Sequence, residues 1–253
     1  MTVISIVNQK GGVGKTTTAV SLAYQLGLQF RTLLIDLDAQ GNATSGFSID
    51  KNGSNSVLDL NLNIDELPNL IKKTNVAKLF VIPASPNLIG LESVLANVDN
   101  RSFILSENLK KIKTNFDYII IDCPPSLGIA TINSLASSDY VIIPVQGEYY
   151  SLEGLSQLLE TFAAVKEKLN PGIEILGVLM TLYDKRTTLN QQVREEVSKY
   201  FGDKLFKTVI PRNIRLAEAP SHGMTIFEYD KWSKGAKSYK NFVKEVLVLI
   251  NNK

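Results

Sequence analysis

The residues with the clearest chemistry form a glycine-rich segment near the start of the chain. Residues 8–17 read Asn-Gln-Lys-Gly-Gly-Val-Gly-Lys-Thr-Thr and separate an apolar run from a segment with helical spacing. Glycines let successive backbone N–H groups curve around phosphate oxygens, and a helix start adds the positive end of its dipole. We therefore expect a phosphate-binding loop. Its expected nucleotide contacts are Lys10, Gly11, Gly12, Val13, Gly14, Lys15, Thr16 and Thr17.

Two side chains of this loop have specific expected roles. The Lys15 ammonium would neutralise the β- and γ-phosphates, and the Thr16 hydroxyl would ligate Mg²⁺. The segment departs from the usual G-x-x-x-x-G-K-[ST] pattern, because Gln9 stands where the first glycine belongs. A second lysine, Lys10, lies near the front of the loop instead.

Carboxylates follow two other apolar runs. Asp36 and Asp38 end the run Leu33–Ile35, and their spacing of two places them on one face of a continuing strand. The same spacing also suits a structural role in which one of them caps the next turn. Asp122 ends the run Tyr118–Ile121 and is typical of a Walker B carboxylate that holds Mg²⁺ through water. A buried carboxylate needs compensation, which a metal–phosphate complex provides.

The elements that must position these residues are strands alternating with helices. The expected strands are Val3–Val7, Thr32–Ile35, Leu79–Ile82, Tyr118–Ile121, Val141–Val145, Ile173–Met180 and Leu205–Ile210. Most are almost continuously apolar, as expected for strands covered on both faces. Helical spacing is found in Thr16–Leu28, Leu152–Leu169 and Gly235–Lys253. This order predicts an α/β fold, a doubly wound, mostly parallel sheet with helices on both faces. The polar stretch Ser48–Asn63 is expected to be a surface loop.

Composition narrows the class of protein. The 253 residues suit one large domain, and no run approaches the roughly 18 unbroken apolar residues of a membrane span. The start of the chain has neither the basic region nor the cleavage site of a secretory signal. A single cysteine, Cys123, forms no internal disulfide and is expected simply to pack in the core. The single histidine, His222, argues against metal catalysis based on histidine.

Charge is unevenly distributed along the chain. Residues 1–180 contain 13 Lys and Arg against 17 Asp and Glu, whereas residues 181–253 contain 14 against 8. A basic C-terminal third can attract a polyanion, although scattered surface lysines would give the same balance.

The loop Lys10–Thr16 resembles the deviant Walker A motif of the ParA/MinD class of ATPases. In that class the extra lysine, here Lys10, reaches across a nucleotide-sandwich dimer to the partner's ATP. The resemblance continues through Asp36–Gly46, Ile121–Gly128 and Ile210–Gly223. The last segment resembles the chromosomal ParA proteins, also called Soj, and is not a feature of MinD. Ala39, where the family usually has proline, and Lys185, where glycine is common, depart from the family pattern.

The resemblance implies roles for particular residues. Asp38 would polarise the attacking water and complete a catalytic set with Lys10 and Lys15. Asp36 would support the Mg²⁺ shell formed with Thr16 and Asp122. The segment that begins at residue 210 would close over the adenine. The implied base contacts are Pro211 and Asn213, and the implied DNA contacts are Arg186 and Arg215.

The family implies an ATP-dependent DNA segregation ATPase that needs Mg²⁺ and acts in the cytoplasm on the nucleoid. An ATP-bound homodimer would bind duplex DNA without sequence preference, and hydrolysis stimulated by a ParB-like centromere-binding protein would release it. Residues 1–253 are expected to form a single P-loop ATPase domain with no helix-turn-helix extension before it. No stable membrane association is expected.

Three other functions stay open on the sequence alone. A MinD-like ATPase at the division site would need a membrane-targeting C-terminal helix, but Lys240–Leu247 contains few cations. A metabolic P-loop enzyme similar to dethiobiotin synthetase would need a substrate pocket and no DNA affinity. A relative that positions another cargo on the nucleoid would share every motif described above.

Overall fold

The apolar runs of the sequence form one seven-stranded sheet. The computed structural model describes residues 1–50, 57–58, 67–112, 115–148 and 151–252. In this part of the chain the strands are β1 (Thr2–Ile6), β2 (Thr32–Asp36), β3 (Lys72–Lys73), β4 (Leu79–Ile82), β5 (Tyr118–Asp122), β6 (Tyr140–Gln146) and β7 (Glu174–Thr181). Every residue of β2 and β5 is buried, as their unbroken apolar sequences predict.

The strand order is β3-β4-β2-β5-β1-β6-β7. Every pairing in the sheet is parallel except that of β3 with β4. The carboxyl ends of the parallel strands therefore meet at one edge, where β1 lies between β5 and β6. The expected doubly wound α/β fold is confirmed.

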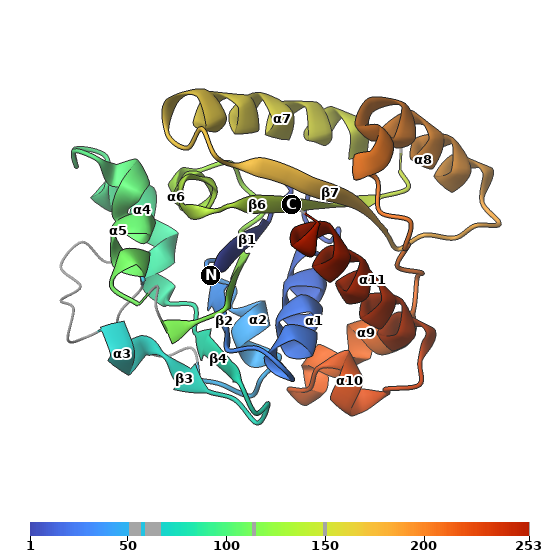
Figure 1. Ribbon diagram of the computed structural model, residues 1–253, viewed down its shortest axis with the longest axis horizontal. Coiled ribbons are helices and arrows are strands. Elements are labelled where there is room, and N and C mark those ends of the chain that lie inside the picture. Colours follow the sequence, from blue (N-terminus) through green and yellow to red (C-terminus); the bar gives the residue numbers. More distant parts are fainter. Residues whose placement is uncertain (51–56, 59–66, 113–114, 149–150, 253) are drawn as a thin grey trace.

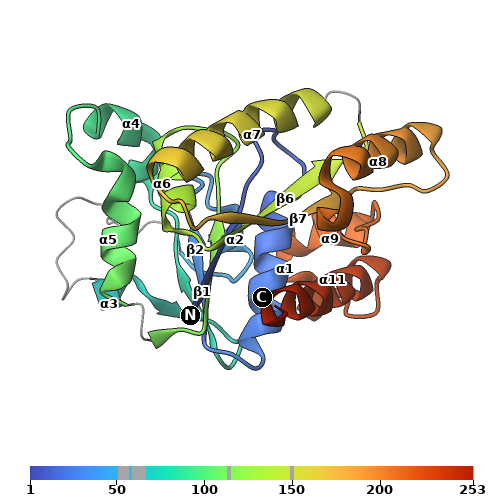
Figure 2. The ribbon, with the colours of Figure 1, turned by 45° about the horizontal axis from the view of Figure 1, so that its top comes forward.

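Helices cover both faces of the sheet (Figures 1 and 2). The helices of the described residues are α1 (Lys15–Gly27), α2 (Asn42–Ser45), α3 (Leu67–Leu70), α4 (Leu91–Val94), α5 (Ile104–Lys110), α6 (Ile129–Ser137), α7 (Ser151–Lys168), α8 (Thr188–Phe201), α9 (Ile214–Glu218), α10 (Ile226–Tyr229) and α11 (Lys234–Asn251). None of them is long and apolar enough to cross a membrane.

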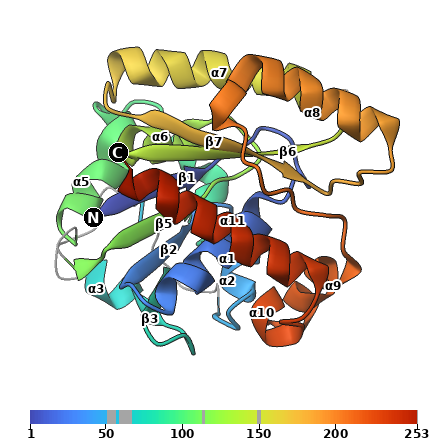
Figure 3. The ribbon, with the colours of Figure 1, turned by 45° about the vertical axis from the view of Figure 1, so that its right-hand side comes forward.

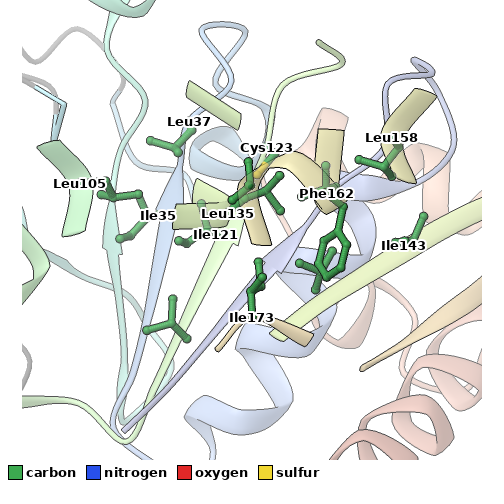
Figure 4. Packing of buried hydrophobic residues seen from close by; sticks show 14 of the residues in the cluster. Ile35, Leu37, Leu105, Ile121, Cys123, Leu135, Ile143, Leu158, Phe162 and Ile173 are labelled. Atoms are coloured by element: carbon green, nitrogen blue, oxygen red, sulfur yellow. The ribbon is translucent and has the colours of Figure 1, made fainter. Parts of the chain in front are cut away.

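Each face of the sheet has its own core. On one face, side chains of α5, α6 and α7 pack against alternate residues of the strands, among them Ile35, Ile121 and Ile143 (Figure 4). Cys123 lies in this core as a buried free thiol. Its Sγ donates to the Ser134 hydroxyl, and burial raises the pKa of the thiol to about 12. The expected packing role of this cysteine is confirmed.

The other core lies between the sheet, α1 and α11. Figure 3 shows α11 crossing in front of α1. The helix begins after Ser233, whose side chain accepts from the Ala236 N–H, and it buries Tyr239, Phe242, Val243 and Val246. The C-terminal helix predicted from the sequence is thus docked on the protein through its apolar face.

The structure differs from the expected strands in two places. Leu205–Ile210 is not a strand but an extended segment that bridges to β7 through Leu205 and to Tyr183 through Pro211. The N–H groups of Phe206 and Ile210 donate to the Val178 and Met180 carbonyls, so the segment lies beside β7. Between them, the N–H groups of Lys207 and Thr208 donate to the Glu245 carboxylate of α11, at 2.6 and 3.0 Å, so no regular strand forms. The two-residue β3 has no apolar sequence signal. Most of the predicted loop Ser48–Asn63 lies outside the described residues.

Glu245 therefore ties the segment before residue 211 to α11. We expect Glu245→Ala to lower the free energy of unfolding by about 1–2 kcal/mol, because two backbone N–H groups lose a charged acceptor. Urea unfolding measures this difference. The matched control is Glu167→Ala on the exposed side of α7, and equal stability losses in the two variants would contradict the role given to Glu245.

Candidate nucleotide-binding site

The glycine-rich loop lies between β1 and α1 at the carboxyl edge of the sheet. Gly12 and Gly14 have φ angles of +73° and +85°, a region in which residues with a Cβ are strained. Gly14 is the residue before α1, so the second of these turns directs the chain into the helix. The glycines are thus required by the backbone path itself.

The carbonyl groups of the loop are tied to the rest of the molecule. The Gly12 carbonyl accepts from Gln146 Nε2 at 2.6 Å, and the Val13 carbonyl accepts from Thr181 Oγ1 at 2.7 Å. Among the described residues, the backbone N–H groups of residues 11–17 have no acceptor. The first turn of a helix leaves such donors free, and together they form a cradle suited to an anion.

Lys15 crosses this loop from the first residue of α1. Its Nζ donates to the Lys10 carbonyl at 2.9 Å, and its side chain is buried. Burial lowers the pKa of Lys15, and the nearby charges of Asp122, Cys123 and Asp38 act in the opposite direction. The ammonium is therefore held at the loop with little access to water.

Asp36 and Asp122 lie side by side at the ends of β2 and β5, because the register pairs them directly. Both are buried, with 1% and 0% of their surface exposed. In the described part of the chain neither oxygen of Asp122 has a hydrogen-bond partner. Burial and the charge of Asp36 raise the pKa of Asp122 well above its ordinary value, whereas the neighbouring Thr16 hydroxyl and Lys15 lower it. An unpaired buried carboxylate beside a phosphate cradle fits a Mg²⁺ site.

Asp36 differs from Asp122 because both of its carboxylate oxygens accept hydrogen bonds. They accept from the Thr44 N–H and hydroxyl at 2.8 and 2.7 Å, and from the Asp38 N–H at 3.2 Å. Burial raises the pKa of Asp36 to about 6 despite these hydrogen bonds. Asp38 Oδ1 in turn accepts from the Gln40 N–H at 3.0 Å. Asp36 thus anchors the turn that presents Asp38 next to the loop.

Lys10, the second lysine of the motif, forms an ion pair with Glu148. Lys10 Nζ lies 2.6 Å from the Glu148 carboxylate just after β6, and both side chains are partly exposed. The Lys10 N–H also donates to Asn8 Oδ1 at 2.9 Å, which fixes the backbone at the front of the loop. The ammonium is therefore at the surface and paired within its own chain.

The two expected base contacts, Pro211 and Asn213, come directly after the segment Leu205–Ile210. Pro211 bridges to Tyr183 beyond the end of β7. Asn213 caps α9, and its side chain accepts from the Arg215 N–H at 2.9 Å. Both residues lie at the carboxyl edge of the sheet. The side-chain oxygen of Asn213 already accepts the hydrogen bond that caps α9.

The two arginines expected to contact DNA are exposed, but both form ion pairs. Arg186 donates from Nε and Nη2 to the two oxygens of Asp184, at 3.0 and 2.8 Å. Arg215 donates to Glu218 at 3.0 Å and lies 3.8 Å from Asp230. A phosphate at either arginine therefore competes with a carboxylate of the same chain.

Sequence reasoning missed the residues that hold the loop in place. Gln146, Thr181 and Glu148 bond to the loop or to its second lysine, and Asn8 Nδ2 fastens its start to the Pro144 carbonyl at 2.7 Å. Gln146 and Thr181 are each the last residue of a strand and directly follow a buried apolar run. A polar residue at that place, at the edge where all carboxyl ends meet, is the signal that identifies them.

The fold and this site define a class. In a P-loop nucleotide hydrolase an inner strand of a mostly parallel sheet leads through a glycine loop into a helix, and acidic residues end neighbouring strands. The present fold and site have these features, with two lysines in the loop.

Comparison with known proteins gives the family. The family model described as an AAA domain matches residues 1–175. The Bacillus subtilis sporulation initiation inhibitor protein Soj is 54% identical over 246 residues, which are 96% of this chain and 97% of that protein. The chain belongs to the Soj/ParA family of partitioning ATPases.

Solved structures share the fold. A Mycobacterium smegmatis cobyrinic acid a,c-diamide synthase with a bound ATP analogue and magnesium is 33% identical, with a TM-score of 0.81 and coverage of 98% of this chain and 94% of that one. A putative plasmid partition protein from Borrelia burgdorferi bound to AMPPNP is 26% identical, with a TM-score of 0.78 and 98% coverage of both chains.

The unpaired Asp122 predicts a pH dependence of stability. A carboxyl whose pKa is raised by folding costs no stability below its unfolded pKa near 4. Above that pH it lowers the free energy of unfolding by up to about 1.4 kcal/mol per pH unit, until the raised value is reached. Without nucleotide and magnesium, we expect Asp122→Asn to lose about 1–3 kcal/mol less stability than the wild type between pH 5 and pH 8.

Urea unfolding at the two pH values measures this difference, with the exposed Asp203→Asn as control. If Asp122→Asn and the control kept the pH dependence of the wild type, Asp122 would not be the uncompensated group.

Proposed function

We propose that this chain is an ATP-dependent DNA segregation ATPase that binds duplex DNA as an ATP-bound dimer. The observation that carries the proposal is the second loop lysine, Lys10, standing at the surface beside a complete phosphate cradle. A lysine that served only the nucleotide of its own chain would have no reason to extend outward to Glu148. The 54% identity to Soj supports the same function.

ATP is the substrate of this site. The free N–H groups of residues 11–17 bind its phosphates, and Lys15 compensates their charge in a region shielded from water. Thr16 and Asp122 would hold Mg²⁺, with Asp36 beside them supporting its shell, and the ion would neutralise phosphate charge. Pro211 and Asn213 contact the base. The nucleotide analogue and magnesium in the related structures support these ligands.

Asp38 orients the attacking water. Its backbone is fixed because Asp36 accepts from its N–H, and its Oδ1 is fixed by the Gln40 N–H. This leaves Oδ2 of the carboxylate for a water molecule near the loop. Lys10 completes the catalytic set from the partner subunit, for which its ammonium must leave Glu148.

Dimerisation couples nucleotide state to DNA affinity. Two protomers present twice the number of arginines and lysines to one duplex, and each added phosphate contact increases a salt-sensitive, sequence-independent affinity. Arg186 and Arg215 contribute to this surface. A ParB-like protein bound at a centromere-like site stimulates hydrolysis and releases the dimer. The protein is thus cytoplasmic and associated with the nucleoid, and residues 1–253 act as one ATPase domain.

The packing of α11 argues against the MinD-like alternative. The apolar residues Tyr239, Phe242, Val243 and Val246 are buried on the protein, so this face of the helix is not available to a membrane. The metabolic alternative is disfavoured because the identity to a partitioning relative, 54%, exceeds the 33% identity to the diamide synthase. A nucleoid-based ATPase that positions another cargo shares all of these features and differs only in its partner.

Asp38 is tested by separating binding from turnover. We expect Asp38→Ala to bind ATP and form the dimer, yet to hydrolyse ATP at least roughly 100-fold more slowly, because the water loses its orienting carboxylate. Phosphate release and size-exclusion chromatography with ATP measure the two properties. Asp50→Ala, on the chain beyond α2, is the control. Turnover at the wild-type rate in Asp38→Ala would remove Asp38 from the catalytic set.

DNA binding tests the proposal as a whole. We expect the wild type to bind a nonspecific duplex with ATP but not with ADP, and more weakly as salt increases. Arg215→Ala should lower this affinity while leaving the ATP-dependent dimer intact. Fluorescence anisotropy of a labelled duplex at two salt concentrations measures both. No DNA binding with any nucleotide would contradict the proposal, and ATP-dependent binding to liposomes would then favour the MinD-like function.

A further inference from the structure

A second cationic feature includes Arg186 and lines a hollow of about 790 Å³ beyond the end of β7. Three separate parts of the chain meet there: the residues that follow β7, the first half of α8, and the segment that links residue 209 to the start of α11. Its charged lining residues are Asp184, Lys185, Arg186, Arg194, Arg212 and Lys234. Five cations against one carboxylate make this hollow strongly positive.

Most of these cations are not neutralised. Arg186 pairs with Asp184, and its pairing uses the one carboxylate of the lining. Among the described residues, no carboxylate lies within ion-pair distance of Lys185, Arg194, Arg212 or Lys234. Like charges gathered without counter-charges repel one another, so a hollow of this kind favours binding of a polyanion.

The structure also orients part of this charge. The Arg194 guanidinium lies 5.9 Å from the centroid of the Tyr183 ring, which is itself buried. Lys234 is the first residue of the 18-residue α11, so the positive end of that helix dipole adds to its own charge. Both cations are therefore placed at the hollow by packing and secondary structure, and are not simply scattered lysines.

We propose that this hollow binds phosphates of the duplex DNA backbone, with Arg194 and Lys234 as contacts in addition to Arg186 and Arg215. The inference rests on the proposed function, since it concerns how the same DNA is held. The paired arginines must exchange a carboxylate for a phosphate, whereas Arg194, Lys185, Arg212 and Lys234 need not. The hollow therefore supplies affinity that does not depend on breaking ion pairs within the chain.

The test compares two double variants with equal net charge. Arg194→Ala/Lys234→Ala removes two cations of the hollow, and Lys199→Ala/Lys240→Ala removes two exposed cations from the same helices α8 and α11, away from it. We expect the first variant to reduce the slope of log affinity against log salt by about 2 for each protomer that contacts the duplex. At about 0.1 M salt its affinity should fall roughly tenfold to a hundredfold.

We expect the control double variant to change far less, and Arg194→Lys to retain most of the affinity of the wild type because it keeps the charge. ATP turnover and the ATP-dependent dimer should be unchanged in all of these variants, which shows that they fold. Anisotropy of a labelled random-sequence duplex with ATP is the measurement, and inorganic polyphosphate is the competitor that represents a free anion.

A variant expected to bind duplex DNA more tightly provides an independent test. Asp184→Asn removes the one carboxylate of the hollow and releases Arg186, while its side-chain oxygen can still accept from the Arg186 N–H. We expect tighter duplex binding in this variant, an outcome that misfolding does not produce.

The possible failures are distinct. If the wild type bound no duplex with ATP, the proposed function would fail and the inference with it. If the wild type bound DNA but the hollow variant behaved like its control, only the inference would fail. The inference alone would also fail if removing the two cations weakened binding of polyphosphate but not of the duplex.

Discussion

The site depends on keeping charged groups out of water at one edge of the sheet. Asp36 and Asp122 are paired in register on β2 and β5, and Lys15 lies close enough to influence both the loop and Asp122. Taking a carboxylate out of water is costly unless opposite charge or hydrogen bonds replace the lost solvent. Asp36 receives hydrogen bonds from Thr44, whereas in the described part of the chain Asp122 has the nearby charge of Lys15 but no hydrogen-bond partner, and its pKa stays raised. The negative charge of the buried Asp122 carboxylate is therefore incompletely compensated, and a cation held beside a polyphosphate would compensate it.

Hydrogen bonds to the sheet hold the loop and the acidic residues of the site in place. The parallel strands bring distant residues to the same edge, and Gln146 and Thr181 turn the loop carbonyls toward the sheet. With the carbonyls so engaged, the N–H groups are left for the ligand. Thr44 links the Asp36 carboxylate to the Ala84 N–H beyond β4, so the turn that carries Asp38 is fixed to the sheet as well. A preformed arrangement of this kind costs little reorganisation when the nucleotide binds.

Features determined by local sequence were predictable, and those determined by distant contacts were not. The loop, the apolar strands and the acidic residues at their ends have short sequence signals, so the sequence predicted that Lys15, Asp36 and Asp122 lie at one site, and the structure brings them together. Leu205–Ile210 has the composition of a strand and lies beside β7, yet two N–H groups in its middle donate to Glu245, some 40 residues away, so no regular strand forms. The pairing of Lys10 with Glu148 likewise joins residues 138 positions apart. No local pattern indicates such a partner.

The same ion pairs relate the nucleotide site to the DNA surface. Lys10, Arg186 and Arg215 are each expected to act on a second molecule, and each is bound to a carboxylate of its own chain. An exposed pair of this kind adds little stability because solvent screens it, so it can be exchanged for a phosphate at small cost. The free energies of the arginine with its carboxylate and with a phosphate are similar. Whether the phosphate replaces the carboxylate therefore depends on how many such contacts form together. A dimer that engages one duplex through both protomers makes the contacts collectively, whereas a monomer makes half as many. In the proposed dimer, weak pairs within the chain would therefore make binding to DNA sensitive to assembly, and assembly would in turn require that Lys10 leave Glu148 for the nucleotide of the partner.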